Sequence, residues 1–402
     1  MKNEEQQNNA NFYGLGIAPK IMELINRMQF KTPTPIQFKA IPIAIEGKDI
    51  VGVAQTGTGK TMAFGIPMIQ RLAQGPGRAM ILVPTRELAL QVDEALQKLA
   101  RPMGLKSAVL IGGASMSNQL RMLRHNPMII IATPGRLIDH LRQRTFRLNE
   151  FKILVLDEAD RMLDMGFMPQ IEQVLKNLPK DRQTMLFSAT IPEKIVRIAT
   201  QYMKLPVSVE IARSGTAAKN VTQELFIISK EDKIQLLEKL LHQYRGTVLL
   251  FMRTKRGAAR ITRRIREMGH NVAEIHSDRS LRQRRDALDG FKTGKFRILA
   301  ATDIAARGID VKEIELVINF DLPDDAENYV HRIGRTGRAS HEGRAISFAT
   351  PDQKGDVRSI ERVMQKALPI VKHPEINELG FYATQARSFG PKRSRFRRRK
   401  RR

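Results

Sequence analysis

A glycine-rich turn occupies residues 54–61, with the sequence AQTGTGKT. It follows the apolar run at 49–54 and precedes a stretch expected to be helical, so it predicts a strand–turn–helix unit. The start of a helix favours anions, and three backbone N–H groups are available there. These donors belong to Gly57, Thr58 and Gly59. Lys60 would reach the β- and γ-phosphates of a nucleotide and Thr61 would bind Mg²⁺. The turn is a candidate phosphate loop, with Ala54 where many such loops have glycine.

Two adjacent carboxylates end a second apolar run, ILVLDEAD at 153–160. Residues at the carboxyl ends of parallel strands lie where α/β proteins bind ligands. Asp157 is suited to holding Mg²⁺ through its water shell, and Glu158 to orienting and deprotonating an attacking water. Taken alone, the pair also fits acidic residues that merely end a strand. Together with the phosphate loop, it predicts an enzyme that hydrolyses a nucleoside triphosphate.

A third stretch, HRIGRTGR at 331–338, alternates arginine and glycine. The residues concerned are Arg332, Arg335 and Arg338, with Gly334 and Gly337 between them. Glycine costs about 1 kcal/mol relative to alanine inside a helix, so an exposed basic helix would not use it. A disordered basic tail would not need such regular spacing. We therefore expect a set of guanidinium groups aimed at a specific anion.

Short apolar runs of strand length alternate with helical stretches along most of the chain. In the first half they lie at 49–54, 79–83, 107–111, 128–132, 152–156 and 184–188. In the second half they lie at 224–229, 247–251, 272–275, 297–301, 315–320 and 345–349. Such a pattern predicts parallel sheets covered by helices on both faces. The fold class is therefore α/β, with two doubly wound parallel-sheet domains in tandem.

The pattern changes at two places, which we take as domain boundaries. Residues 212–220, ARSGTAAKN, are small, polar and aperiodic, so they predict a linker between domains at 1–211 and 221–368. Residues 369–402 are assigned to a basic tail, in which 392–402 carry nine basic side chains in eleven positions. Such a segment cannot bury apolar surface, so we expect it to be disordered and to bind phosphates without reading sequence.

The composition limits the class of protein further. The 402-residue chain has a net charge of +27, which predicts a polyanionic partner, although a generally basic surface is the alternative. It contains no cysteine, which excludes disulfides and thiolate metal sites. The N-terminus has no apolar leader and no apolar run is long enough to span a bilayer. We expect a soluble, cytoplasmic protein with no membrane partner.

With these motifs and several others, the sequence resembles the DEAD-box ATP-dependent RNA helicases, most closely the bacterial RhlE type. The resemblance covers residues 12–368. The matching stretches are FKTPTPIQ (30–37), AQTGTGKT (54–61), PTRELA (84–89), Gly112–Gly113, TPGR (133–136), DEAD (157–160), SAT (188–190), TDIAARGID (302–310) and HRIGRTGR (331–338). It implies RecA-like domains, ATP with Mg²⁺, and single-stranded and duplex RNA as partners. Ribosome-assembly and RNA-decay complexes are candidate assemblies.

The resemblance also implies roles at the ATP site. In the Q motif (10–38), Gln37 would bond the adenine edge and Phe12 would pack on its face; alone, these residues also fit a turn glutamine and a core phenylalanine. Asp310 would bond the ribose. The other implied ATP-binding residues are Phe30, Ala54, Gln55, Thr56, Gly57, Thr58, Gly59, Lys60, Thr61 and Gly308.

Residues of both domains would take part in catalysis. Lys60, Asp157 and Glu158 would act from the first domain, with Mg²⁺ held by Thr61 and Asp157, partly through water. From the second domain, Arg335 and Arg338 would act as arginine fingers on the γ-phosphate. Their intervening glycines would let the backbone approach the phosphates. His331 would couple to the first domain's carboxylates rather than bind a metal.

An RNA track and a coupling segment complete the implied site. Hydroxyls, backbone amides and arginines suit phosphate oxygens without reading sequence. The implied RNA-binding residues are Pro84, Thr85, Arg86, Gly113, Thr133, Pro134, Arg136, Arg284 and Thr302. Ser188, Ala189 and Thr190 would couple the nucleotide site to RNA-dependent closure of the domains.

Three positions depart from the family pattern, all on the RNA side of the second domain. Leu281 stands where the family usually has glutamine, Ser277 where it commonly has glycine, and Arg253 where a small or polar residue is usual. None of them touches the ATP chemistry.

The expected function is that of an RNA-dependent ATPase that locally unwinds RNA duplexes or remodels RNA–protein complexes. A non-catalytic RNA clamp is one alternative, but it predicts loss of residues such as Lys60 or Glu158, and both are present. A DNA helicase is the other alternative. Only contacts to 2′-hydroxyl groups distinguish RNA from DNA, and no residue type in a sequence identifies such contacts.

Overall fold

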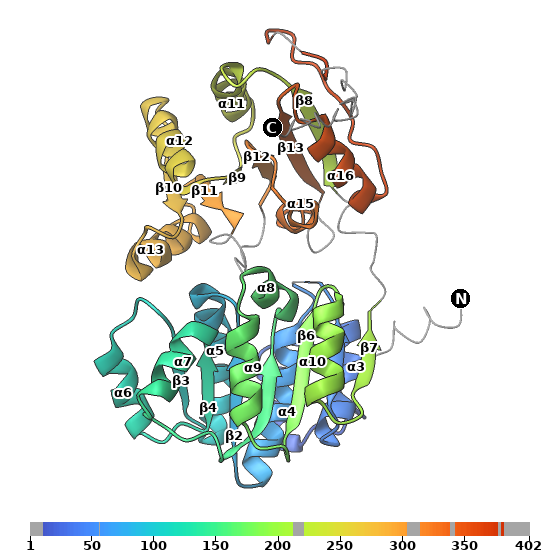
Figure 1. Ribbon diagram of the computed structural model, residues 1–402, viewed down its shortest axis with the longest axis vertical. Helices are drawn as coiled ribbons and strands as arrows, with labels where there is room; N and C mark the ends of the chain where they lie inside the picture. The colour runs from blue at the N-terminus through green and yellow to red at the C-terminus, as the bar shows by residue number, and fades with distance from the viewer. Residues whose placement is uncertain are drawn as a thin grey trace, which may run out of the picture.

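A computed structural model describes residues 11–55, 57–211, 221–303, 314–337, 342–376 and 379–381. Figure 1 shows two α/β units, which we call the first unit (11–211) and the second unit (221–381). Each is built around one parallel sheet with helices on both faces. The expected linker at 212–220 lies outside the described residues.

The sheet of the first unit has seven strands in the order β3-β4-β2-β5-β6-β1-β7. Every neighbouring pair is parallel. The strands are β1 (Ile50–Val53), β2 (Arg78–Leu82), β3 (Ser107–Leu110), β4 (Ile129–Ala132), β5 (Phe151–Leu156), β6 (Gln183–Ser188) and β7 (Val207–Glu210). Six of them match runs expected from the sequence. The seventh, β7, was not expected.

The helices of the first unit connect these strands. They are α2 (Pro19–Arg27), α3 (Pro35–Ile45), α4 (Lys60–Gln74), α5 (Arg86–Ala100), the short 3₁₀ helix η1 (Arg101–Met103), α6 (Met116–Arg124), α7 (Pro134–Arg142), α8 (Ala159–Asp164), α9 (Met168–Asn177) and α10 (Glu193–Tyr202). Because parallel strands need a crossover between them, each strand's carboxyl end leads into a loop or a helix N-terminus on the same edge of the sheet.

Alternate residues of the central strands enter two apolar layers. On β5, Ile153 and Val155 belong to one core cluster while Leu154 and Leu156 belong to the other. All four are at most 2% exposed. Burial on both faces explains why these strands read as continuous apolar runs rather than as alternating ones. Burying one such side chain contributes about 1.5–3 kcal/mol, so the sheet is a firm base for the loops at its edge.

The second unit repeats this architecture with six parallel strands in the order β10-β11-β9-β12-β13-β8. The strands are β8 (Val221–Ile227), β9 (Val248–Met252), β10 (Val272–Ile275), β11 (Ile298–Thr302), β12 (Leu316–Asn319) and β13 (Gly343–Ala349). The helices are α11 (Asp232–Gln243), α12 (Lys255–Glu267), α13 (Leu281–Lys292), α15 (Ala326–Ile333) and α16 (Lys354–Met364). The prediction of two tandem parallel-sheet domains is confirmed.

The chain after α16 differs from the expectation of a tail that starts at residue 369. Leu225 on β8 donates its N–H to Pro369 O at 2.8 Å and accepts from Val371 N at 2.9 Å. Leu379 N then donates to Ile227 O at 3.0 Å, and Ile376 is buried. Residues 369–376 and Leu379 therefore pack on the second unit, because a few apolar side chains among polar neighbours suffice to hold a segment on a strand.

The longest helices of the described residues, α4 and α5, have 15 residues each. Nowhere in the described part of the chain does a helix combine the length and apolar character that crossing a membrane requires.

Candidate active site

The predicted phosphate loop lies between β1 and the first residue of α4, as the sequence indicates. Gly57 and Gly59 have φ values of 85° and 91°, a left-handed conformation that favours glycine. Thr58 Oγ1 donates to Gln55 O at 2.7 Å, which closes the turn. The buried Lys60 donates through Nζ to Ala54 O at 2.9 Å. Its ammonium group is thus held inside the loop, where a phosphate would meet it.

Gln37 joins the Q-motif helix α3 to this loop. Its Nε2 donates to Gly59 O at 3.0 Å, and its Oε1 accepts from Thr34 N at 2.9 Å. A Cβ at Gly59 would collide with Gln37 Nε2, so glycine is required there for space as well as for conformation. The structure thus places Gln37 against the phosphate loop, and its contact with adenine stays a prediction.

The two aromatic residues expected near adenine differ in exposure. Phe12 is 3% exposed and packs in the apolar core of the first unit. Phe30 is 39% exposed and lies just before the Q-motif helix. In this structure Phe12 matches the alternative of a core phenylalanine. Phe30 is the more exposed of the two.

The acidic pair lies at the carboxyl end of β5, next to the loop. Asp157 and Glu158 are each 3% exposed. Glu158 adopts the left-handed conformation, with φ 53° and ψ 49°, immediately before α8. Asp157 Oδ1 accepts from Glu158 N at 3.0 Å, and Glu158 Oε2 accepts from Arg161 Nη1 at 2.6 Å. A non-glycine residue in this conformation costs about 1–3 kcal/mol, and such strain is typical of functional sites.

The pKa values of the two carboxyl groups shift in opposite directions. Burial raises the pKa of Asp157 to about 6, against the opposing charge of Lys60. Burial also acts to raise the pKa of Glu158, but Arg161, Lys60 and Arg335 together lower it to about 2. Separated pKa values in an adjacent acidic pair are typical of active sites, where each group has a different task.

The last residue of the DEAD motif, Asp160, binds the expected coupling segment. Asp160 Oδ2 accepts from Ala189 N at 3.0 Å, from Thr190 N at 2.8 Å and from Thr190 Oγ1 at 3.1 Å. Asp160 N donates to Ser188 Oγ at 3.2 Å. Ser188 O in turn accepts from Ala54 N at 2.9 Å. The coupling segment is therefore bonded both to the acidic motif and to the phosphate loop.

The arginines of the 331–338 stretch divide into two kinds. Arg332 is 1% exposed, and its guanidinium group bonds Asp303 at 2.6 and 2.7 Å and stacks 4.9 Å from the ring centre of Phe251. It is a structural arginine of the second unit, because the anion that it meets is a carboxylate of the same unit. Arg335, by contrast, lies close enough to Glu158 to lower its pKa.

The rest of this stretch adds two details. Arg335 Nε donates to His331 O at 3.2 Å, so α15 and the turn after it hold the arginine in place. Gly337 has a φ of 66°, and a Cβ on Gly343 would collide with its backbone, so close packing of two chain segments requires these glycines. That reason differs from the expected approach to phosphates. Arg338 lies outside the described residues.

The predicted RNA track of the first unit gathers at the carboxyl ends of three neighbouring strands, β3, β4 and β2. Thr85 caps α5, with Oγ1 accepting from Leu88 N at 3.2 Å, and Thr133 precedes α7. Arg86 lies against Gly113, where a Cβ would collide with its guanidinium group. Arg136 donates to Ala114 O at 3.4 Å from the other side. Two predicted track residues remain: Pro84 is buried between β2 and α5, and Pro134 is the first residue of α7.

On the second unit, Arg284 meets a partner that the sequence did not indicate. Its Nη2 donates to Glu87 Oε2 of the first unit at 2.9 Å, and both side chains are buried. Leu281, one turn earlier on α13, packs against the core of the first unit. Thr302 lies at the end of β11 and is half-buried. The two units thus meet through an ion pair and an apolar contact on the RNA side.

Four predicted site residues lie outside the part of the chain that the structure describes. They are Thr56, Gly308, Asp310 and Arg338. Three others were missed by sequence reasoning, namely Glu87, Asp160 and Arg161. Asp160 lies in the identified DEAD motif and Glu87 in the identified PTRELA motif, so their positions could have indicated a role in the site. Arg161 follows DEAD at helical spacing from Glu158, which is a weaker signal.

Whether the acidic site fits Mg²⁺ can be judged from its donors. A buried carboxylate at Asp157 and the hydroxyl of Thr61, at the second residue of α4, are oxygen ligands of the kind this ion prefers. Burial raises the pKa of Asp157 in the protein alone, and a nearby divalent cation would oppose that effect. The residues present fit the ion.

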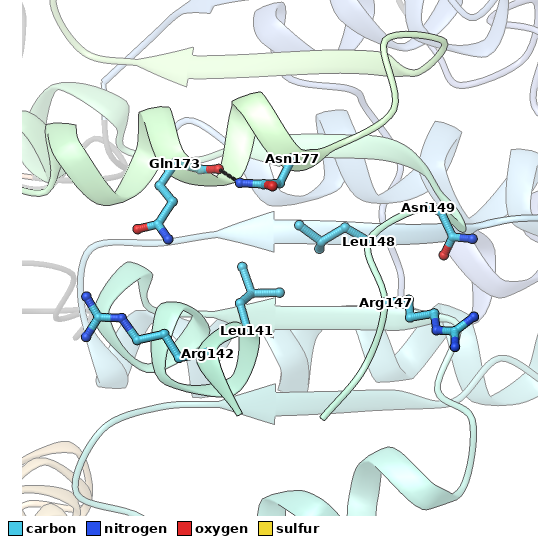
Figure 2. A pocket seen from close by; sticks show the side chains of 7 residues that line it. All are labelled: Leu141, Arg142, Arg147, Leu148, Asn149, Gln173 and Asn177. Atoms are coloured by element: carbon cyan, nitrogen blue, oxygen red, sulfur yellow. Dashed lines mark hydrogen bonds between the residues drawn. The ribbon is translucent and has the colours of Figure 1, made fainter. Parts of the chain in front are cut away.

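A separate pocket of about 470 Å³ lies away from this site, between α7, α9 and the segment before β5. Figure 2 shows Arg142 and Arg147 on opposite sides of it and Leu141 and Leu148 between them. It borders the amino end of β5, whereas Asp157 and Glu158 follow the carboxyl end. The pocket therefore takes no part in the nucleotide site.

Comparisons with known proteins agree with this geometry. A family model described as DEAD/DEAH box helicase matches residues 34–198, and one described as helicase conserved C-terminal domain matches residues 232–340. The ATP-dependent RNA helicase CshA of Listeria monocytogenes is 43% identical over 370 residues, which cover 91% of this chain and 71% of that protein. The ATP-dependent rRNA helicase RRP3 of Candida albicans is 43% identical over 362 residues, covering 89% and 68%.

Solved structures of RNA-bound proteins are also similar to this chain over most of its length. S. cerevisiae Dbp5 bound to RNA and ADP BeF3 is 31% identical, with a TM-score of 0.79 over 90% of this chain and 95% of that one. The DEAD-box helicase Mss116 bound to ssRNA and UDP-BeF is 28% identical, with a TM-score of 0.82 over 90% and 78%.

Proposed function

The chain belongs to the DEAD-box ATP-dependent RNA helicases, and from this premise we propose how its own residues bind and hydrolyse ATP and hold RNA. It is an RNA-dependent ATPase that locally unwinds RNA duplexes or remodels RNA–protein complexes. ATP is the nucleotide, and RNA is the macromolecular partner. What remains to be assigned is the task of each residue.

One observation carries the proposal: cations of both units act on the same carboxylate. Lys60 of the first unit and Arg335 of the second each lower the pKa of Glu158. A γ-phosphate placed among these groups would meet positive charge from both sides. Such charge stabilises the transition state of phosphoryl transfer and needs no rearrangement at the moment of reaction. Hydrolysis then requires that the two units be held together.

Within this arrangement, Lys60 binds the phosphates and Glu158 orients the attacking water by accepting its hydrogen bond. With so low a pKa, Glu158 stays ionised but is a weak proton acceptor, so orientation is its main task. Thr61 and Asp157 would hold Mg²⁺, which neutralises charge on the phosphate oxygens when bound. Arg335 stabilises the γ-phosphate, and Arg338 is proposed to act beside it.

Base recognition falls to the Q motif. Gln37 is proposed to bond the adenine edge while it stays attached to the phosphate loop. The more exposed Phe30 is better placed than the buried Phe12 to cover the base. Asp310 and Gly308 keep their proposed place at the ribose side.

RNA is proposed to run along the ends of β3, β4 and β2, against Arg86, Arg136 and the turn at Gly113. Asp160 then links RNA binding to hydrolysis, because it bonds Thr190 and shares a backbone segment with Glu158. An RNA strand that holds the second unit against these strand ends would complete the site around ATP.

The natural RNA is a finer question. The name of one relative, an rRNA helicase, supports ribosomal RNA as a proposed substrate, with ribosome assembly ahead of RNA decay. Assignment to the RhlE type and a cytoplasmic location stay predictions from the sequence.

A steady-state ATPase panel tests the function. Turnover is measured with no nucleic acid, single-stranded RNA, duplex RNA and DNA, and the Lys60→Ala variant is the matched control. We expect stimulation by RNA but not by DNA, and loss of turnover in the folded variant. Equal stimulation by DNA would favour a DNA-directed helicase. Normal turnover in Lys60→Ala would refute the phosphate-loop assignment, and ATP-independent RNA binding without any turnover would favour an RNA clamp.

A further inference from the structure

Helix α12 carries an unusual concentration of positive charge for a helix that packs on a sheet. Of its 13 residues, Lys255, Arg256, Arg260, Arg263, Arg264 and Arg266 are basic and only Glu267 is acidic. All seven side chains are exposed. Its apolar side, formed by Ala258, Ile261, Thr262 and Ile265, is buried against the sheet. The charge therefore lies on the outer surface of the second unit.

Three of these arginines form a stripe with no ion-pair partner among the described residues. Arg256, Arg260 and Arg263 follow the i, i+4, i+7 spacing that places side chains on one helical face. The other three basic residues are engaged: Lys255 pairs with Asp278 at 2.7 Å, Arg264 pairs with Glu267 at 3.0 Å, and Arg266 donates to Val272 O at 3.5 Å. Three exposed guanidinium groups of like charge repel one another, so a polyanion would stabilise the stripe.

The neighbouring helix α13 shows the opposite arrangement. Its exposed Arg282 and Arg285 face Asp286 and Asp289 at 3.9 and 3.7 Å, each one turn further along. Both helices pack on β10 and β11 at the same end of the sheet, but α12 contributes to one apolar layer and α13 to the other, so they cover opposite faces. Unbalanced charge is thus a property of α12 and not of every exposed arginine nearby.

The stripe begins near the RNA side of the second unit. Helix α12 begins at the carboxyl end of β9, on the edge of the sheet that also carries Thr302 at the end of β11. It then runs back along the sheet, away from the first unit, and in the view of Figure 1 α13 lies between α12 and the first unit. From Arg256 to Arg263 the helix rises about 10 Å. The stripe therefore leads outward from the rim of the RNA side.

We propose that Arg256, Arg260 and Arg263 form a second phosphate-binding surface, which holds RNA that extends beyond the proposed RNA track. This inference rests on the proposed RNA track. Guanidinium groups bind phosphate oxygens bidentately without reading bases, as a helicase with varied substrates requires. A membrane is a poorer fit, because the apolar side that an amphipathic helix would insert is already buried.

The test compares two triple variants of the full chain. Arg256→Gln/Arg260→Gln/Arg263→Gln removes the stripe. Arg358→Gln/Arg362→Gln/Lys366→Gln removes the same charge from exposed residues of α16 and the turn after it, on the other side of the second unit. Each is assayed for RNA-stimulated ATPase activity with two substrates. One is a short RNA strand that fills only the proposed RNA track, and the other is the same strand extended by a hairpin.

For the stripe variant we expect the concentration of hairpin RNA needed for half-stimulation to rise about tenfold, with a much smaller change for the short strand. The slope of log affinity against log salt for the hairpin RNA should fall by about 2 to 3, or nearly one for each lost phosphate contact. The α16 variant should match the wild type on both substrates. A lysine version of the stripe should recover most of the salt slope, because it keeps the charge.

Equal behaviour of the stripe and α16 variants would overturn the proposal. So would an equal loss with the short strand, since the stripe would then belong to the track itself. Weakened binding of anionic lipid vesicles or polyglutamate with unchanged RNA binding would assign the stripe to another partner. Absence of any RNA stimulation in the wild type is a different result, because it would refute the proposed function instead.

Discussion

The Nη1 atom of Arg161 lies 2.6 Å from the Oε2 atom of Glu158, and neither side chain is more than 4% exposed. The pair lies within the first turn of α8, so the helix that follows the acidic motif fixes the direction of its catalytic carboxylate. Removing one partner of a buried ion pair typically costs about 3–5 kcal/mol, because the other charge is left buried and unpaired.

Arg161→Met is therefore expected to shift the pH dependence of catalysis. Arg161 is a main cause that lowers the pKa of Glu158, so its loss raises that pKa and Glu158 takes up a proton at higher pH. The acid limb of the kcat profile should move to higher pH, while Arg161→Lys, which keeps the charge, should move it less. An unchanged profile in a folded Arg161→Met protein would exclude this role for Arg161.

Asp157→Asn should stabilise the protein while it abolishes ATP turnover. The pKa of Asp157 is raised to about 6, so its ionised form destabilises the native state at neutral pH. Removing the charge should gain on the order of 2 to 3 kcal/mol above pH 6 without nucleotide or Mg²⁺. The gain should shrink as the pH falls and vanish below about 4, where the carboxyl is protonated in both states. Denaturant unfolding at several pH values measures it, and an equal gain at pH 3 and pH 8 would contradict the assignment.

Two arginines three residues apart should give opposite phenotypes. Arg332→Ala leaves Asp303 without its two bonds inside the second unit, so it should lower the melting temperature. Arg335→Ala should leave nucleotide-free RNA binding nearly unchanged but reduce kcat by at least about a hundredfold. Thermal unfolding and steady-state kinetics of both variants separate the two roles. Loss of nucleotide-free RNA affinity in Arg335→Ala with normal kcat would make Arg335 an RNA contact instead.

The Arg284–Glu87 pair makes a prediction that separates an inter-unit contact from an RNA contact. Glu87→Gln and Arg284→Gln should each raise the RNA concentration needed for half-stimulation, and the double variant should be no worse than either single one. A coupling of about 1–3 kcal/mol is usual for residues in direct contact. If Arg284 acts only on RNA, as the sequence predicted, Glu87→Gln would be silent and the two effects would add.

Much of the fold and of the ATP site could be predicted because the signals are local. Apolar runs buried on both faces gave twelve of the thirteen strands, and the loop at 54–61 needs its own glycines wherever it occurs. Strand β7 was missed because Val207–Glu210 is short, partly exposed and alternating, and it gains its stability from pairing with β1.

The contacts that the sequence did not indicate join segments far apart in the chain. Nothing near Arg332 indicates that Asp303 and Phe251 will surround it, and nothing near Arg284 indicates Glu87, almost two hundred residues earlier. Nor does the place of Phe12 in the Q motif indicate that its ring is only 3% exposed in the core of the first unit. Residue type and spacing specify which groups are available, whereas tertiary packing decides which of them face the cleft.

The contacts of Pro369, Val371 and Leu379 with β8 have a consequence for self-association of the protein. Strand β8 is the last strand of its sheet, and an uncovered strand edge is a template for pairing with another chain. Pro369, Val371 and Leu379 occupy part of that edge, so a protein cut after residue 368 should expose it and self-associate, as sedimentation would detect. A protein cut after residue 386 should lose ten basic residues without this effect. A stretch that looks like the start of a tail thus protects the sheet against aggregation.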